Sequence, residues 1–440
     1  MEIEIQNVAR IATVKVDVSG ITVLAGPNGS GKSTVSRSLM SASSLALHMT
    51  KLMDISRISS IFELIERLFA EMRLPFDMYS DWYYVEEEIW KPLLVPDFWV
   101  EPAPFLSWCG EHFGRSLEKP TIGYMMPITP AKTRALKERW PVFSESVLSR
   151  IATKESAHAR NAAEDVVSRA FVGQAKPLGR RSVSGCIKLS DKEGLLSVAL
   201  KAGEVAACSM SGTMPISSLF YIEPSNQLDF FSAGPWMPRR RIRDEIDRYT
   251  AFEYCYYNVV NLDKPAPMTM EEKRQWRLTC ACVEKILKKI GGRLDKQSHR
   301  LFFNEDRNDS NLSISLQNVA SGIKSIASVC RAIEMNALKA NGLLIIDEPE
   351  SNLHPDWQVA VAEFLVSLHI ERGIKILINT HSPYMLRALR HFENKSGRKD
   401  ACSFYQMIEG PDGYIADPVT HKVDVLFQDL FAPFEEIMRD

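Results

Sequence analysis

A glycine-rich stretch at residues 26–34, GPNGSGKST, carries residue types that bind the phosphates of a nucleotide. It matches the P-loop pattern G-x-x-x-x-G-K-[ST] at every fixed position. Glycines let backbone N–H groups close around phosphate oxygens at a helix N-terminus, and the lysine adds a cation beside the β- and γ-phosphates. We therefore predict a site for a nucleoside triphosphate, with a Mg²⁺ ligand at Ser33. Its residues are Gly26, Pro27, Asn28, Gly29, Ser30, Gly31, Lys32, Ser33 and Thr34.

Two acidic residues at the end of an apolar stretch are the second feature expected of a site that hydrolyses a nucleotide. Residues 343–346 are Leu-Leu-Ile-Ile, and Asp347 and Glu348 follow directly. An α/β sheet presents its functional groups at the carboxyl ends of strands. Phosphoryl transfer needs charge neutralisation and a positioned nucleophile. We therefore predict Asp347 in the Mg²⁺ shell and Glu348 as the group that orients or deprotonates the attacking water.

The elements that must position these residues are readable from hydrophobic patterns. An apolar strand at residues 21–25 precedes the P-loop and a helix at residues 35–40 follows it. From residue 293 to 381, strands and helices alternate as in a doubly wound α/β sheet. Because 315 residues separate Lys32 from Asp347, more than a single compact domain usually holds, an inserted domain must lie between them. No heptad pattern persists there, so the insertion is predicted to be globular.

Three further segments resemble motifs of the ATP-binding-cassette (ABC) class of ATPases. They are ASGIK at residues 320–324, DEPESNLHP at 347–355 and NTHSP at 379–383. Together with the P-loop they resemble the soluble branch of that class, which includes chromosome-maintenance and repair ATPases, OLD-type ATPases, and free-standing bacterial phage-defence ATPases such as those of Septu and retrons. The resemblance implies an ABC-type P-loop ATPase head, a mixed sheet flanked by helices, with a large, mostly helical globular insertion. It also implies ATP and Mg²⁺ as cofactors.

The same resemblance implies roles for individual residues. Ser321 and Gly322 would form the signature that closes over the γ-phosphate held by another subunit, and residues 351–353 would form the crossing D-loop. His381 would be the switch histidine, acting in hydrolysis with Lys32 and Glu348. The signature lacks the usual second glycine, and His354 stands where the D-loop commonly has Asp. Gln174 and Gln227 are the candidates for the glutamine loop.

Four regions follow from these motifs. We predict the N-terminal part of the head at residues 1–42, an inserted helical and β subdomain at 43–215, and a connecting strand and helical segment at 216–310. The C-terminal part of the head, with the signature, acid pair, D-loop and switch histidine, is predicted at 311–440.

Charged and aromatic residues are unevenly distributed in the intervening chain. Residues 76–110 hold many aromatics with seven acids and one lysine, which is consistent with a small subdomain core or with a docking surface for a partner protein. Residues 131–181 hold eleven Lys or Arg and five acids, and Arg239, Arg240, Arg241 and Arg243 form a second basic run. Each basic stretch is either a solvated helix face or a contact for nucleic acid or a partner.

The composition indicates the cellular compartment and excludes several classes of protein. The net charge of −2 excludes a global polycation, and eight scattered cysteines suggest neither a zinc ribbon nor a disulfide framework. No signal peptide or apolar span is apparent, so we expect a cytoplasmic protein that does not enter a membrane. Residues 407–412 superficially resemble the start of a Toprim nuclease, but a β-hairpin is the better interpretation because only 28 residues follow Asp412.

The leading hypothesis is therefore an ATPase that forms a head-to-head dimer around two Mg·ATP and controls a separate effector. By resemblance, that effector would be a nuclease or toxin in bacterial antiviral defence. A repair or chromosome ATPase that acts directly on DNA is the alternative. The nucleotide-binding subunit of a transporter fits the signature and D-loop departures poorly.

Overall fold

The computed structural model describes residues 1–71, 130–177, 184–223, 264–297, 300–306, 312–398 and 400–439. The chain divides into two compact units. The first comprises Met1–His48, Ala163–Pro235 and Asp247–Asp440, and it contains the P-loop and the acid pair. The second comprises Met49–Ala162 and Trp236–Ile246. The basic run at 239–243, the acidic aromatic stretch at 76–110 and Gln227 lie outside the described residues.

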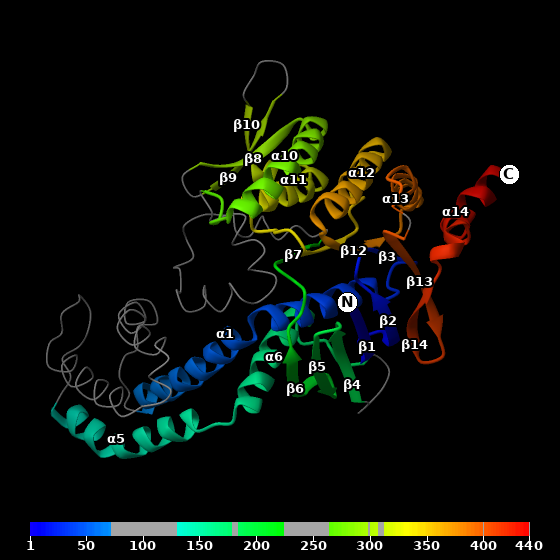
Figure 1. The fold of residues 1–440 in the computed structure, drawn as a ribbon. Helices are drawn as coiled ribbons and strands as arrows, with labels where there is room; N and C mark the ends of the chain where they lie inside the picture. Colours follow the sequence, from blue (N-terminus) through cyan, green and yellow to red (C-terminus); the bar gives the residue numbers. More distant parts are fainter. Residues whose placement is uncertain are drawn as a thin grey trace. The chain divides into compact units, whose positions relative to one another are not determined.

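The first unit is built on a mixed sheet whose described part has eleven strands in the order β6-β5-β4-β1-β2-β14-β13-β3-β12-β11-β7 (Figure 1). The strands are β1 (Glu2–Val8), β2 (Ile11–Asp17), β3 (Ile21–Ala25), β4 (Ser184–Ser190), β5 (Gly194–Lys201), β6 (Glu204–Gly212), β7 (Leu219–Ile222), β11 (Leu343–Asp347), β12 (Lys375–Thr380), β13 (Cys402–Gly410) and β14 (Gly413–Pro418).

One half of this sheet is parallel and places the predicted site. Strands β13, β3, β12, β11 and β7 are neighbours in parallel register. Every residue of β3, β7 and β11 is buried, because helices cover both faces of a parallel sheet and select continuous apolar runs. The carboxyl ends of β3, β11 and β12 therefore meet at one edge, where the P-loop, Asp347 and His381 follow.

The other half is mostly antiparallel, with β14 pairing in parallel with β2. Strands β4, β5 and β6 form an antiparallel meander in it. Although β4 falls within the region 43–215 that is predicted as an insertion, it pairs with β1 in the large sheet. The pairing aligns Ile3 and Ile5 with Leu189 and Ile187, so it buries their alternating apolar residues on one face. The C-terminal hairpin, β13 with β14, is also confirmed.

The helices are α1 (Lys32–Glu71), α5 (Pro130–Ile151), α6 (Glu155–Phe171), α10 (Met270–Ile290), α11 (Ser321–Glu334), α12 (Pro355–Arg372), α13 (Pro383–Lys395) and α14 (Val423–Arg439). Instead of a short P-loop helix with separate helices after it, α1 is continuous apart from a kink at His48. A small sheet of β10 (Leu312–Ser315), β9 (Arg300–Glu305) and β8 (Gly292–Gln297) lies beside α10 and α11 (Figure 1). Two 3₁₀ turns, η1 (Leu316–Asn318) and η2 (Thr420–Lys422), complete the elements. None of the described helices is sufficiently long and apolar to span a membrane.

Candidate nucleotide site

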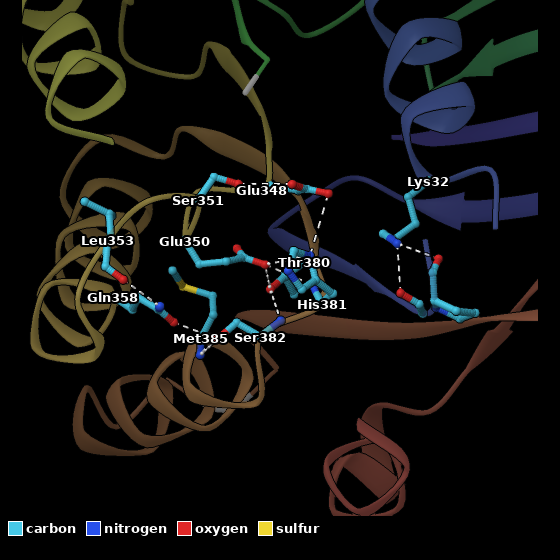
Figure 2. A network of polar contacts seen from close by, with 12 residues as sticks. Lys32, Glu348, Glu350, Ser351, Leu353, Gln358, Thr380, His381, Ser382 and Met385 are labelled. Carbon is cyan, nitrogen blue, oxygen red and sulfur yellow. Dashed lines mark hydrogen bonds and ion pairs between the residues drawn. The ribbon is translucent and has the colours of Figure 1, made fainter. Parts of the chain in front are cut away.

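The P-loop follows β3 and opens α1 at Lys32, as the motif requires. Gly31 has φ +87°, and a Cβ atom there would lie 2.6 Å from Cδ1 of Ile11, so glycine is needed for both conformation and space. The Lys32 ammonium donates to the carbonyl oxygens of Gly26 at 2.8 Å and Pro27 at 2.9 Å (Figure 2). Two of its three donors are thus used to fix its direction, and one remains for a phosphate.

Electrostatics around Lys32 also suit a phosphate. Burial lowers the pKa of Lys32, while the nearby carboxylates of Glu348, Glu350 and Asp347 act in the opposite direction and raise it. The side-chain hydroxyl of Ser30 is buried and has no hydrogen-bond partner among the described residues. A buried polar atom without a partner is costly, so a bound anion at this loop would satisfy it.

Asp347 is buried at the end of β11 and is surrounded by donors. Its carboxylate accepts hydrogen bonds from Nδ2 of Asn379 at 2.6 Å and from the hydroxyl of Tyr221 at 3.1 Å. The nearby hydroxyls of Ser36 and Ser33 act to lower its pKa. Burial nevertheless raises the pKa of Asp347 to about 6. The structure thus brings together the hydroxyl and the carboxylate that the sequence predicts as Mg²⁺ ligands, an oxygen donor set that suits this cation.

Glu348 turns away from the strand in a left-handed conformation, with φ +50°. Such a backbone is unfavourable for a non-glycine residue and is concentrated at functional sites. Ser351 donates its hydroxyl to Glu348 Oε2 at 3.0 Å, and Oε1 lies 3.6 Å from Nδ1 of His381. Figure 2 shows Glu348 and His381 together, across from Lys32. Both side chains are partly exposed, at 31% and 45%, so water can reach them.

Glu350 is a member of this cluster that sequence reasoning did not identify. Its Oε1 accepts the hydroxyl of Thr380 at 2.7 Å and the backbone N–H of His381 at 2.9 Å (Figure 2). The same atom lies 3.5 Å from Nδ1 of His381. Because Glu350 is buried, it fixes the loop after β12 and the position of the histidine. Its position two residues after Glu348 was the feature of the sequence that could have identified it.

A second group of residues that the sequence did not identify forms a ring of polar contacts next to Asp347. The Tyr221 hydroxyl lies 2.7 Å from Glu223 Oε1 as well as contacting Asp347, and Arg37 on α1 pairs with Glu223 at 3.0 Å. Asn379 closes the ring by donating to Ser36 at 2.8 Å. The acid directly after the apolar run 219–222 could have indicated this group. Of the two candidates for the glutamine loop, Gln174 lies in the turn after α6 and Gln227 is outside the described residues. Glu223 is the residue that follows β7.

The signature and D-loop residues lie side by side within the chain. Helix α11 begins at Ser321, and its N-cap, Ala320, makes no side-chain cap hydrogen bond. Asn352 donates to the Ser321 hydroxyl at 2.7 Å, and a Cβ at Gly322 would lie 2.9 Å from the carbonyl oxygen of Ser351. His354 caps α12 by accepting the N–H of Asp356 at 3.3 Å, which is the role an Asp would have there.

These features define an ABC-type P-loop ATPase head: a P-loop after a buried parallel strand, an acid pair at the end of β11, a signature helix, and a histidine after β12. A family model described as "AAA domain, putative AbiEii toxin, Type IV TA system" matches residues 127–387, so the protein belongs to this family. The match begins after the P-loop.

Individual relatives were also found. The Old nuclease of Escherichia phage P2 is 36% identical over 91 residues, which are 20% of this chain and 14% of that protein. Among solved structures, the SmcHead bound to the C-winged helix domain of ScpA has 9% identity and a TM-score of 0.43, covering 96% of this chain and 98% of that one. The SMC head domain from Thermotoga maritima has 10% identity and a TM-score of 0.36, covering 95% and 98%.

Proposed function

We propose that this ATPase binds Mg·ATP at the P-loop, hydrolyses it in a head-to-head dimer, and thereby controls a separate effector protein. The observation that carries the hydrolysis is the position of Glu348, whose carboxylate lies 3.6 Å from His381 and is partly exposed across from Lys32. An acidic group next to the metal ligand, open to water, is what a general base in phosphoryl transfer requires.

Each residue then has one task. The P-loop amides and Lys32 bind the β- and γ-phosphates, and Ser33 with Asp347 holds Mg²⁺, which neutralises developing charge when bound. Glu348 orients the attacking water or takes its proton. His381, fixed through its N–H by Glu350, directs its ring at the same region. Lys32 contributes positive charge at the position that its two carbonyl contacts define.

Dimerisation is inferred from the signature. Ser321 and Gly322 contact the D-loop of their own chain, and the D-loop reaches Glu348 through Ser351. Helix α11 starts without a side-chain cap from Ala320, and the N-terminus of a helix favours an anion. A γ-phosphate presented by a second copy would fill this position, so that ATP is enclosed between two chains.

Two observations support the effector role. The family description refers to a toxin of a type IV toxin–antitoxin system, and the short match is to a phage nuclease. The C-terminal stretch that superficially resembles a nuclease motif is a two-stranded hairpin. We therefore assign the output, in bacterial antiviral defence, to another polypeptide in the cytoplasm.

The test is the native mass of a Glu348→Gln variant purified with its neighbouring gene products, with and without Mg·ATP. The variant should bind ATP but lose turnover on the order of a hundredfold or more, because a general base contributes at least that factor. A closed dimer carrying a second polypeptide is the expected result.

Two variants control this experiment. Glu409→Gln makes the same chemical change at an exposed position of β13 and should hydrolyse ATP like the wild type. Lys32→Ala should lose ATP binding and remain monomeric. A Glu348→Gln protein that stays monomeric with saturating Mg·ATP would contradict the dimer proposal.

The second candidate is an ATPase that acts directly on DNA. The exposed cations of α10 favour it. Recovery of a dimer that carries DNA and no second polypeptide would support this candidate over control of an effector.

A further inference from the structure

Helix α10 carries a row of exposed cations that the nucleotide chemistry does not use. Lys273, Arg274, Arg277, Lys288 and Lys289 are all exposed. At about 100° per residue they occupy about 160° of the helix circumference, and from 273 to 289 they extend about 24 Å. Within the described part of the chain, none of these five side chains is held in an ion pair. We call this surface the α10 basic face.

The acids of the helix do not neutralise this face. Glu284 lies on it, but both of its oxygens accept from Arg293, at 2.9 and 3.1 Å. Glu271 and Glu272 stand in the first turn, where Glu272 closes a capping box with Thr269. The sixth cation of the helix, Lys285, pairs with Glu363 of α12 at 2.7 Å. Positive charge therefore remains along the face.

The face is held rigidly. The opposite side of α10 is buried through Val283, Ile286, Leu287 and Ile290. The indole N–H of Trp276 donates to the carbonyl oxygen of Ile333 on α11 at 3.1 Å. The capping box fixes the first turn, and Gly291, with φ +76°, ends the helix. Cations on a fixed helix lose less conformational freedom when they bind than cations on a loop.

From these observations we propose that the α10 basic face binds the phosphate backbone of duplex DNA. A duplex carries about one negative charge per 1.7 Å of its axis, counted over both strands, so a length of about 24 Å holds about 14 phosphates, of which the face would meet those on the near side. The aromatic residue of α10, Trp276, is packed toward α11 and cannot stack on bases, which favours a duplex over a single strand. Among the side chains of the face that the structure describes, Met270 is the large apolar one that is exposed, which gives little support for a lipid surface.

The test measures binding of a fluorescent 20-base-pair DNA duplex to the full-length protein without nucleotide, across a salt series. Arg277 and Lys288 lie about three turns apart on one stripe. Arg277→Glu with Lys288→Glu should weaken binding on the order of tenfold at low salt and reduce the slope of log K against log salt by about 2. Both residues are exposed and unpaired, so the melting temperature should be unchanged.

The matched control is Arg134→Glu with Lys137→Glu on α5, two exposed cations of the basic stretch 131–181. This pair changes the net charge equally and should leave DNA affinity near that of the wild type. The proposal would be overturned if the wild type failed to bind the duplex at low salt, if the α10 pair bound like the wild type, or if the α5 pair lost as much affinity. Tighter binding to single-stranded DNA, or retention of an acidic protein in place of DNA, would also reject it. ATP turnover, measured in parallel, reports separately on the proposed function.

Discussion

At the scale of single residues, the site keeps a carboxyl group where it is energetically unfavourable. Asp347 is buried, and its pKa is raised to about 6 mainly by the loss of hydration. Two hydrogen-bond donors, Asn379 and Tyr221, and the nearby hydroxyls of Ser36 and Ser33 reduce this cost but do not remove it. A residue retained despite such a cost is consistent with binding a cation that would neutralise it.

This burial predicts the pH dependence of an Asp347→Asn variant. The folded-state pKa, about 6, exceeds the ordinary value of 3.8, so the carboxyl favours the folded state when protonated. This contribution is fully present below pH 4 and is lost as pH rises through 6. Without Mg²⁺ or nucleotide, Asp347→Asn should therefore be more stable than the wild type by about 3 kcal/mol at pH 8 and by about half of that at pH 5.

Denaturant unfolding of both proteins from pH 5 to pH 8 measures this difference. Asp306→Asn, which alters an exposed carboxyl, should show no such pH-dependent gain. A constant difference between Asp347→Asn and the wild type across the range would mean that Asp347 is not the group responsible.

At the scale of elements, the contact between α11 and the D-loop couples the signature to Glu348. A Cβ added at Gly322 would lie 2.5 Å from Cδ2 of Leu353 and 2.9 Å from the carbonyl oxygen of Ser351. Such distances require one element to move. Since Ser351 also donates to Glu348, a shift of α11 would reach the hydrolytic cluster.

Gly322→Ala tests this coupling. In an unconstrained helix, alanine would stabilise by up to about 1 kcal/mol, but overpacking costs roughly 1–3 kcal/mol. We expect a net loss of stability and of ATP-dependent dimerisation, measured by thermal melting and native mass. Leu353→Ala removes the closest obstruction, so the double variant should be less destabilised than the sum of the two single variants. Additive losses would show that Leu353 does not restrain α11.

At the scale of the whole molecule, the proposed dimer divides each site between two chains. A Lys32→Ala chain retains a working signature, and a Ser321→Arg chain retains a working P-loop. Neither should hydrolyse ATP alone. Their mixture should regain turnover, up to about half of the wild-type rate per mixed dimer, because each mixed dimer would contain one intact site of two.

Turnover of the mixed proteins at increasing concentration measures this recovery. A mixture of Lys32→Ala with Glu348→Gln is the control, because both changes affect the chain that holds the nucleotide and every site stays defective. Failure of the first mixture to recover would contradict a site shared between chains, while leaving the P-loop chemistry intact.

The sequence alone determined the local part of this site. Residues 26–34, the acid pair at 347–348 and the helix that begins at Ser321 are contiguous, and their backbone conformations follow from glycines and apolar runs. Local interactions decide such segments, so their boundaries were predicted closely. The hairpin of β13 and β14 was predicted for the same reason.

Only the tertiary structure decided which distant residues surround Asp347. Tyr221 and Asn379 lie on β7 and β12, the two strands that flank β11, and this order depends on parallel pairing between distant segments of the chain. The placement of β4–β6 beside β1 is also non-local. Strand order is set by burial and hydrogen bonding across the whole sheet, which no single stretch of sequence encodes. The sequence therefore predicted the chemistry of the site, and the tertiary structure determined which distant residues surround Asp347.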